Sequence, residues 1–263
     1  MNDTIVKTQA GGVVTLRMNR PANLNALDIN MAYAMDEIAR DLIKDDTVEC
    51  VVLTGTGRAF CAGGDMGGIK SGAERGGSRL LDVAQRGFRL LVESHLPVIT
   101  AVNGVAAGAG FGIALLGDIS IVSSAANFRP AFIALGAVPD LGLAYSLPRL
   151  IGEVRARELL LTNRELSADE AFAYGMVTRV VPADRFEEEV QKAAEALAAA
   201  PRTAMGLTKT LLRQGRTRSF ADYLELEEQA QAAAFKSPEI LEGVAAFREK
   251  RKADFRAARK AKR

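Results

Sequence analysis

Residues 97–112 read PVITAVNGVAAGAGFG, and this stretch decides the fold class. The apolar run at residues 98–102 has the length of a buried strand and ends at an Asn-Gly pair, after which small residues lead into a helix. Residues 51–54 form a similar run that leads through glycines to CAGGD at residues 61–65. Residues 80–91 between the two runs have helical periodicity. Strand, helix and strand in this order predict a right-handed crossover between parallel strands, and hence an α/β fold.

The chain before this unit continues the α/β pattern. Residues 5–9 and 13–18 are β-type runs separated by Ala-Gly-Gly, which predicts a hairpin. Leu27, Met31, Met35, Ile38 and Leu42 then follow with helical spacing. Asp28 or Asn30 can serve as the N-cap of that helix.

The chain after residue 122 is predicted to be mostly helical, and no Pro- or Ser-rich linker separates it from the rest. We therefore expect a core at residues 1–200 and a helical region with a basic tail at residues 201–263. Residues 67–78, rich in Gly, Ser and charge, are expected to form a mobile surface loop.

Histidine and cysteine are scarce, which limits the possible chemistry. Among 263 residues the only ones are His95, Cys50 and Cys61, too few for a zinc site. Two cysteines are also too few for a secreted disulfide scaffold, so we expect a reducing, cytoplasmic location. The N-terminus has no apolar run of signal-peptide length, and the most apolar stretch, residues 105–116, is too short to span a bilayer. We therefore expect neither a metal nor a membrane.

The net charge of +2 conceals an asymmetry along the chain. Residues 245–263 carry nine basic and two acidic residues, a net charge of +7, which leaves −5 for the remainder. Such a run can be a solvated helix face, or it can contact an anion or a nucleic acid. The basic residues are Arg248, Lys250, Arg251, Lys252, Arg256, Arg259, Lys260, Lys262 and Arg263.

The two small-residue loops are the first candidate for chemistry. Gly and Ala let backbone N–H groups approach a ligand, and amides at a helix start lack intrahelical acceptors. One such donor from each loop could form an oxyanion hole. Equally, small residues can serve only to pack strand, turn and helix tightly.

Other motifs fit poorly. The glycine spacing at residues 108–112 departs from the dinucleotide fingerprint, and the sequence has neither a P-loop nor a GxSxG nucleophile motif. His95 would have to serve any catalytic triad, and it lies just before a strand, where a surface or capping role is favoured.

Several motifs together resemble the crotonase (enoyl-CoA hydratase/isomerase) superfamily. They are RPANLNAL at residues 20–27, AFCAGGD at residues 59–65 and PVITAVNG at residues 97–104. The similarity continues at residues 161–164, 171–181 and 242–252, so that it covers nearly the whole chain.

This resemblance implies a spiral of ββα repeats with a helical C-terminal trimerisation region, assembled as a homotrimer or a dimer of trimers. It implies an acyl-CoA substrate, with no cofactor beyond the CoA moiety. The oxyanion donors would be the amides of Gly64 and Ala109. Lys250 matches a position that reaches the nucleotide phosphates of a neighbouring subunit. The residues matched to the path of CoA are Ala22, Leu24, Ala62, Asp65 and Met66.

The departures from the family pattern indicate the reaction. Hydratases of this family carry two Glu residues where this chain has Gly112 and Phe132, neither of which can transfer a proton. Asp140, in an otherwise apolar surrounding, stands where several isomerases have an acidic residue, and burial would raise its pKa into the range of a useful base. Phe132 is expected to help shape the acyl pocket. Alternatively, Asp140 only caps the helix that follows it.

Three hypotheses follow from these residues. The favoured one is an enoyl-CoA isomerase, acting on a double bond or a ring-derived thioester, with Asp140 as acid and base. The second is substitution or thioester hydrolysis with Asp140 as nucleophile, as in the 4-chlorobenzoyl-CoA dehalogenase branch. That branch uses a His and a Trp, and this chain has Gln85 and Phe132 at the two corresponding positions. His95 lies too late in the chain to replace that His. The third is a non-catalytic binder of acyl-CoA or RNA, although nucleic acid is the less favoured partner for the tail.

Overall fold

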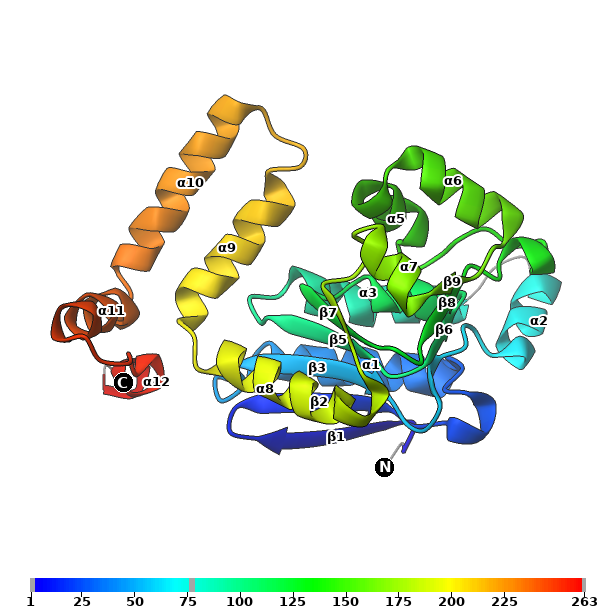
Figure 1. The fold of residues 1–263 in the computed structure, drawn as a ribbon, viewed down its shortest axis with the longest axis horizontal. Coiled ribbons are helices and arrows are strands. Elements are labelled where there is room, and N and C mark those ends of the chain that lie inside the picture. The colour runs from blue at the N-terminus through cyan, green and yellow to red at the C-terminus, as the bar shows by residue number, and fades with distance from the viewer. Residues whose placement is uncertain (1–2, 76–78, 262–263) are drawn as a thin grey trace.

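The computed structural model describes residues 3–75 and 79–261, and its centre is a six-stranded sheet (Figure 1). The strand order is β1-β2-β3-β5-β7-β10, in which β1 and β2 form the predicted antiparallel hairpin and all later pairs are parallel. The strands are β1 (Ile5–Ala10), β2 (Val13–Met18), β3 (Cys50–Gly55), β5 (Val98–Val102), β7 (Ile119–Ser123) and β10 (Arg179–Val181).

A second, smaller sheet has the order β4-β6-β8-β9. Its strands β4 (Ala59–Cys61), β6 (Val105–Ala107) and β8 (Asn127–Arg129) follow β3, β5 and β7 directly, and β9 (Leu166–Ser167) pairs antiparallel with β8. Each repeat of the fold is therefore a strand of the large sheet, then a strand of the small one. The helix that follows β4 or β6 begins beside this small sheet, which brings the small-residue loops together.

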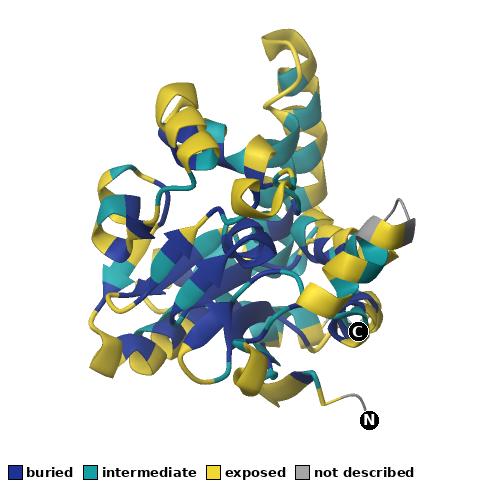
Figure 2. Ribbon diagram, turned by 90° about the vertical axis from the view of Figure 1, so that its right-hand side faces the viewer, coloured by how far each residue is buried: buried dark blue, intermediate teal, exposed yellow. Residues whose placement is uncertain are grey.

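The large sheet is covered on both faces, which is why its inner strands are continuous apolar runs. In β3, Val51 and Leu53 pack into the core beneath α1 (Ile29–Leu42) and α3 (Arg79–Glu93). Cys50 and Val52 point the other way and pack against α8 (Phe186–Ala198), which crosses the opposite face (Figure 1). In Figure 2 the strands are dark blue at the centre, and exposed residues lie on the surrounding helices.

Local signals set several helix starts. The Asp28 carboxylate accepts a hydrogen bond from the amide of Met31 (2.8 Å), which confirms Asp28 as the N-cap of α1. A capping box formed by Ser167 and Glu170 begins α7 (Ala168–Ala173). Helix α5 (Leu143–Ile151) and helix α6 (Glu153–Thr162) pack together above the small sheet.

Residues 66–75 form helix α2 (Met66–Arg75), so that the expectation of a surface loop at residues 67–78 is wrong over most of its length. Residues 76–78 lie outside the described residues. Helix α2 retains an apolar side, since Ile69 lies against Gly64 and Leu80 of α3 lies against Gly68. These contacts offset the low helix propensity of its glycines.

The C-terminal region is an arm of four helices that extends from the core (Figure 1). They are α9 (Arg202–Gln214), α10 (Phe220–Phe235), α11 (Pro238–Glu249) and α12 (Phe255–Ala261). The predicted boundary at residue 200 falls between α8 and α9, and the domain division itself stays a prediction. The Lys209 ammonium of α9 anchors the arm, because it pairs with Asp118 at 2.8 Å. Large apolar side chains of the arm remain exposed, among them Phe220, Phe235, Leu241 and Phe247.

No helix within the described part of the chain is both long enough and apolar enough to cross a membrane.

Candidate active site

The two small-residue loops meet at the edge of the small sheet. A β-carbon at Gly63 would lie 3.0 Å from the carbonyl oxygen of Ala107, and one at Gly110 would overlap the carbonyl oxygen of Cys61. Gly63 also has a φ of 105°, which favours glycine. Tight packing is therefore one reason for the small residues, and it brings the loop after β4 against the start of α4 (Ala109–Ala114).

The backbone at Gly64 leaves its amide available for a ligand. The Leu27 amide donates to the carbonyl of Gly63 (2.7 Å), and the Asp65 amide donates to the carbonyl of Leu27 (2.8 Å). In parallel pairing of this kind, the N–H of the residue between those two groups points to the opposite side. Ala109 is the first residue of α4, so its amide has no acceptor within the helix. Both predicted donors thus have suitable backbone settings, and the oxyanion hole itself stays a prediction.

The residues predicted to contact CoA lie beside these loops. Ala22 belongs to an exposed turn, η1 (Pro21–Asn23), and the carbonyl of Leu24 accepts a hydrogen bond from the amide of Ala62 (3.0 Å). Met66, at the start of α2, is 62% exposed, which leaves its thioether available to a ligand. The structure therefore brings this predicted set to one place.

Asp65 is held by the protein itself. Its carboxylate pairs with Arg20 (3.1 Å) and accepts a hydrogen bond from the amide of Gly67 (3.0 Å). Arg20 also donates to the carbonyl of Ala26 (2.5 Å), so that it ties the loop after β2 to the loop after β4. Sequence reasoning did not find this role of Arg20, although an Arg and an Asp at the ends of two matched motifs were a usable signal.

Asp140 comes close to α4. A β-carbon at Gly112 would lie 3.0 Å from the Asp140 carbonyl oxygen and 3.1 Å from the β-carbon of Leu141. The negative charge of Asp140 also acts on Cys61, whose pKa is raised to about 11 mainly by burial. The carboxyl therefore lies within electrostatic range of Cys61, in the strand that leads to the Gly64 loop, while the backbone of Asp140 lies against α4.

The carboxyl group of Asp140 is poorly solvated. Its Oδ1 atom is buried and has no hydrogen-bond partner among the described residues. Burial raises the pKa of Asp140 to about 6, against a smaller lowering effect from its own backbone N–H. A carboxyl group of this kind can both accept and return a proton near neutral pH.

The structure rules out the capping role considered for Asp140. Helix α5 begins at Leu143, its N-cap is Gly142, and no side chain caps it. Asp140 contributes only its backbone, since its carbonyl accepts a hydrogen bond from the Leu143 amide (3.0 Å). The carboxyl is thus not engaged in holding the helix.

Phe132, in the same loop as Asp140, is buried in the main core and only 7% exposed. It precedes the short turn η2 (Ile133–Leu135). The backbone before it is fixed because the Ala131 amide donates to the side chain of Asn163 (2.6 Å). Its role in an acyl pocket stays a prediction.

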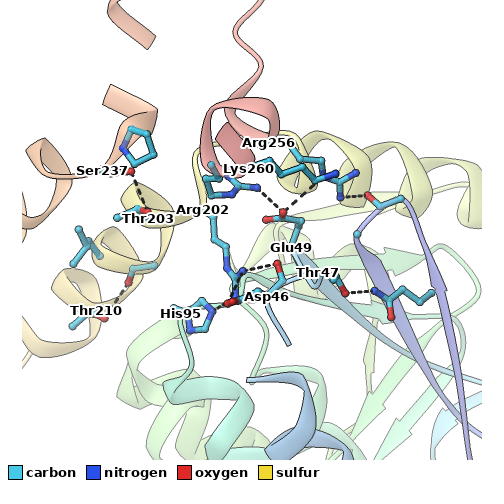
Figure 3. Close-up of a pocket in the computed structure, with 17 residues that line it drawn as sticks. Asp46, Thr47, Glu49, His95, Arg202, Thr203, Thr210, Ser237, Arg256 and Lys260 are labelled. Carbon is cyan, nitrogen blue, oxygen red and sulfur yellow. Dashed lines mark hydrogen bonds and ion pairs between the residues drawn. The ribbon is translucent and has the colours of Figure 1, made fainter. Parts of the chain in front are cut away.

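His95 and Lys250 lie away from this site. His95 lines a cavity of about 950 Å³ beside α9 and α12, and its Nε2 lies 2.6 Å from an Arg202 guanidinium nitrogen (Figure 3). Partial desolvation and the nearby Arg202 charge lower the pKa of His95. Lys250 is exposed at the end of α11, on the opposite side of the molecule from α2 (Figure 1).

The same cavity shows what part of the basic tail does. Arg256 pairs with Glu49 (Figure 3) and donates a hydrogen bond to the carbonyl of Gly11. Arg259 bridges Glu49 and Glu239. Arg251 is likewise paired with Glu242 (2.6 Å). These three basic residues of the tail are therefore paired with the chain's own acids. Arg256 and Arg259 fasten the arm to the core through Glu49, whereas Arg251 pairs within the arm.

Comparison with known proteins agrees with this geometry. Residues 8–258 match the family model described as enoyl-CoA hydratase/isomerase. The chain is 38% identical over 260 residues to a 1,2-epoxyphenylacetyl-CoA isomerase of Escherichia coli, covering 97% of this chain and 99% of the relative. It is 35% identical to a 4-chlorobenzoyl coenzyme A dehalogenase of an Arthrobacter species, covering 91% and 88%. The structure of an enoyl-CoA hydratase from Bacillus anthracis superposes with a TM-score of 0.89 at 31% identity, covering 96% and 99%.

The chain belongs to the enoyl-CoA hydratase/isomerase family and has the crotonase fold. This confirms the resemblance read from the sequence motifs and the predicted fold class. The relatives carry isomerase, dehalogenase and hydratase names, so that the reaction has to be argued from the site.

Proposed function

We propose that this enzyme isomerises an unsaturated acyl-CoA thioester, with Asp140 as the group that removes and returns the proton. The observation that carries the proposal is the Asp140 carboxyl, which has a buried, unpartnered oxygen and a pKa raised to about 6. The backbone of Asp140 lies against α4 at Gly112, where the family's hydratases carry a glutamate and where a side chain has almost no room. The similarity to a 1,2-epoxyphenylacetyl-CoA isomerase supports the same chemistry.

The proposed steps conserve all atoms. The amides of Gly64 and Ala109 bind the thioester oxygen, and the Asp140 carboxylate takes a proton from a carbon conjugated to the thioester. The electrons move into a dienolate whose oxygen the two amides stabilise. The protonated Asp140 then returns the proton to another carbon, which moves the double bond. The cycle needs no group beyond the CoA moiety of the substrate.

We further propose that CoA lies along Ala22, Leu24, Ala62, Asp65 and Met66. Lys250 ends α11, which Figure 1 shows at the opposite end of the molecule from α2, so it lies far from this path within its own chain. We therefore propose that it contacts the phosphates of CoA on a neighbouring subunit of a homotrimer or a dimer of trimers. The exposed apolar residues of the arm support such an assembly.

A substitution or hydrolysis reaction with Asp140 as nucleophile is the second candidate, and the dehalogenase relative favours it. That reaction needs a base to activate water after the aspartyl ester forms. His95 lies in a different part of the molecule, and Gln85 cannot accept a proton. Mass spectrometry under single turnover with aryl-CoA substrates would detect an Asp140 ester if this candidate were correct.

A non-catalytic or RNA-binding role is the third candidate. The internal pairing of Arg251, Arg256 and Arg259 removes much of the positive field on which it depended.

The test uses a panel of 3-enoyl-CoA and ring-derived thioesters. We expect Asp140→Asn to reduce isomerisation at least about 100-fold, because general acid–base catalysis contributes on that order. Asp169→Asn, an exposed aspartate on α7, is the matched control and should keep wild-type activity. Equal activity of Asp140→Asn and wild type in every isomerisation found would remove Asp140 from the mechanism.

A further inference from the structure

The turn that carries Asp140 has an unusual conformation. The Leu143 amide donates to the Asp140 carbonyl (3.0 Å), and the two residues between them have positive φ, 43° at Leu141 and 77° at Gly142. This is the pattern of a type I′ turn, whose central positions are normally Gly, Asn or Asp. A leucine in the left-handed region is strained because its β-carbon approaches the following carbonyl. The rest of the structure must therefore hold Leu141 in place.

Packing against α4 holds it. Leu141 is 4% exposed and belongs to the main core. A β-carbon at Gly112 would lie 3.1 Å from both the β-carbon and the carbonyl oxygen of Leu141. Gly112 thus allows the turn to approach α4 closely, and the burial of Leu141 compensates for its backbone strain.

Leu141 also borders a cavity beside Asp140. A cavity of about 1160 Å³ lies between α3, α5 and α9, and Leu141, Gly142 and Tyr145 are among the residues that line it. Asp140 and Gly112 do not line it. Leu141 therefore borders this cavity directly next to Asp140 in the chain.

We propose that Leu141 is a positioning residue: its left-handed conformation holds the Asp140 carboxyl against α4, and its side chain keeps water of the adjacent cavity away from that carboxyl. The catalytic meaning of this role rests on the proposed function of Asp140. The role itself concerns only the environment of the carboxyl, so that it can be tested without a substrate.

Among the described residues, no charged group shifts the pKa of Asp140, which burial and its own backbone N–H set. The ionisable groups on neighbouring elements are Cys61 of β4 and, on α5, Tyr145 and Arg149. Burial keeps the Cys61 thiol neutral, since its pKa is raised to about 11. Tyr145 and Arg149 are exposed and stack on each other, with the guanidinium 3.7 Å from the ring centroid. The pKa of the Asp140 carboxyl is thus set mainly by the exclusion of water, and this is the effect that a substitution at Leu141 would alter.

The experiment follows the carboxyl carbon of Asp140 by NMR as a function of pH, in protein labelled with 13C at aspartate and assigned with Asp140→Asn. In wild type we expect a midpoint of about 6. In Leu141→Gly and Leu141→Ala we expect the midpoint to move to about 4, the ordinary range of a solvated aspartate. Leu141→Met, which retains the bulk of the side chain, should restore the wild-type midpoint.

Leu147→Ala is the control, because Leu147 is a fully buried leucine of α5 that does not line the adjacent cavity. It should lower the stability of the protein and leave the midpoint unchanged. If Leu141→Gly does not fold, Leu141→Ala decides, since it retains a β-carbon at the turn. A wild-type midpoint in both truncations, or an equal shift in Leu147→Ala, would overturn the proposal.

The two proposals fail in different ways. If the midpoint moves as expected but no isomerisation depends on Asp140, the positioning role stands and the proposed function is wrong. If Asp140→Asn abolishes isomerisation while the Leu141 variants titrate like wild type, the function stands and the positioning role is wrong.

Discussion

At the scale of single residues, the central finding is the pair formed by Gly112 and Asp140. The sequence predicted Asp140 because the two glutamate positions of the family's hydratases are empty. The structure adds a physical reason, since the turn at Asp140 occupies the space beside residue 112. Leu141 and Arg20 were not predicted, because a strained leucine contradicts local propensity and an ion pair between distant loops leaves no periodic pattern.

The raised pKa of Asp140 has a consequence for stability. The folded protein binds the proton of Asp140 more tightly than the unfolded chain does. The contribution of this proton to the free energy of unfolding is therefore fully present below pH 3.8 and is lost as pH rises through about 6. Asp140→Asn should therefore stabilise the protein at pH 8, by roughly 1 to 3 kcal/mol, and by much less at pH 3.8. Urea unfolding of both proteins at the two pH values measures this difference. A loss of stability at pH 8 would contradict the burial of the carboxylate.

At the scale of elements, the sequence predicted the units with strong periodicity. The hairpin, the buried strands and helix α1 with its cap at Asp28 appear as expected. The small sheet was not predicted, because β4, β6 and β8 have only three residues each and consist partly of small side chains. Helix α2 was mistaken for a loop because its contacts with Gly64 and Leu80 are tertiary.

The helices of the arm are held together by Glu239 of α11, which is 3% exposed. Its carboxylate accepts hydrogen bonds from the amides of Arg202 (2.8 Å) and Thr203 (2.9 Å) at the start of α9, and it pairs with Arg259. Burial alone would raise the pKa of Glu239, but these partners lower it on balance.

Glu239→Ala should destabilise the protein by about 2 to 4 kcal/mol, because it leaves Arg259 and two helix amides without their acceptor. Since the pKa is lowered, the stabilisation by Glu239 is present above pH 4.5 and is lost as pH falls below it. Thermal unfolding between about pH 3 and 7 checks both statements. Glu249→Ala, which removes an exposed carboxylate, is the control and should change little.

At the scale of the whole molecule, the arm and the proposed active site lie on different sides, and the arm exposes large apolar residues (Figures 1 and 2). The sequence indicated a helical C-terminal region, but composition alone does not show which helix faces lack partners. In the structure, α10 buries none of its residues, which suits a surface completed by other copies of the chain.

We predict that the protein sediments as a trimer or hexamer and that Phe235→Asp, on the exposed side of α10, shifts it toward monomer. Lys250→Ala should retain the oligomer and weaken CoA binding, by about tenfold if one charge-assisted contact of about 1.4 kcal/mol is lost. Sedimentation velocity and calorimetric titration with CoA measure the two effects. A wild-type protein that is monomeric at micromolar concentration would contradict the assembly.

The role of Asp140 as the proton-transferring base can be measured through the pH dependence of the single-turnover isomerisation rate. Because the carboxylate must be ionised to accept a proton, we expect a constant rate above pH 6 and a fall of about tenfold per pH unit well below it. A rate that stays constant from about pH 4 to 8 would contradict this role.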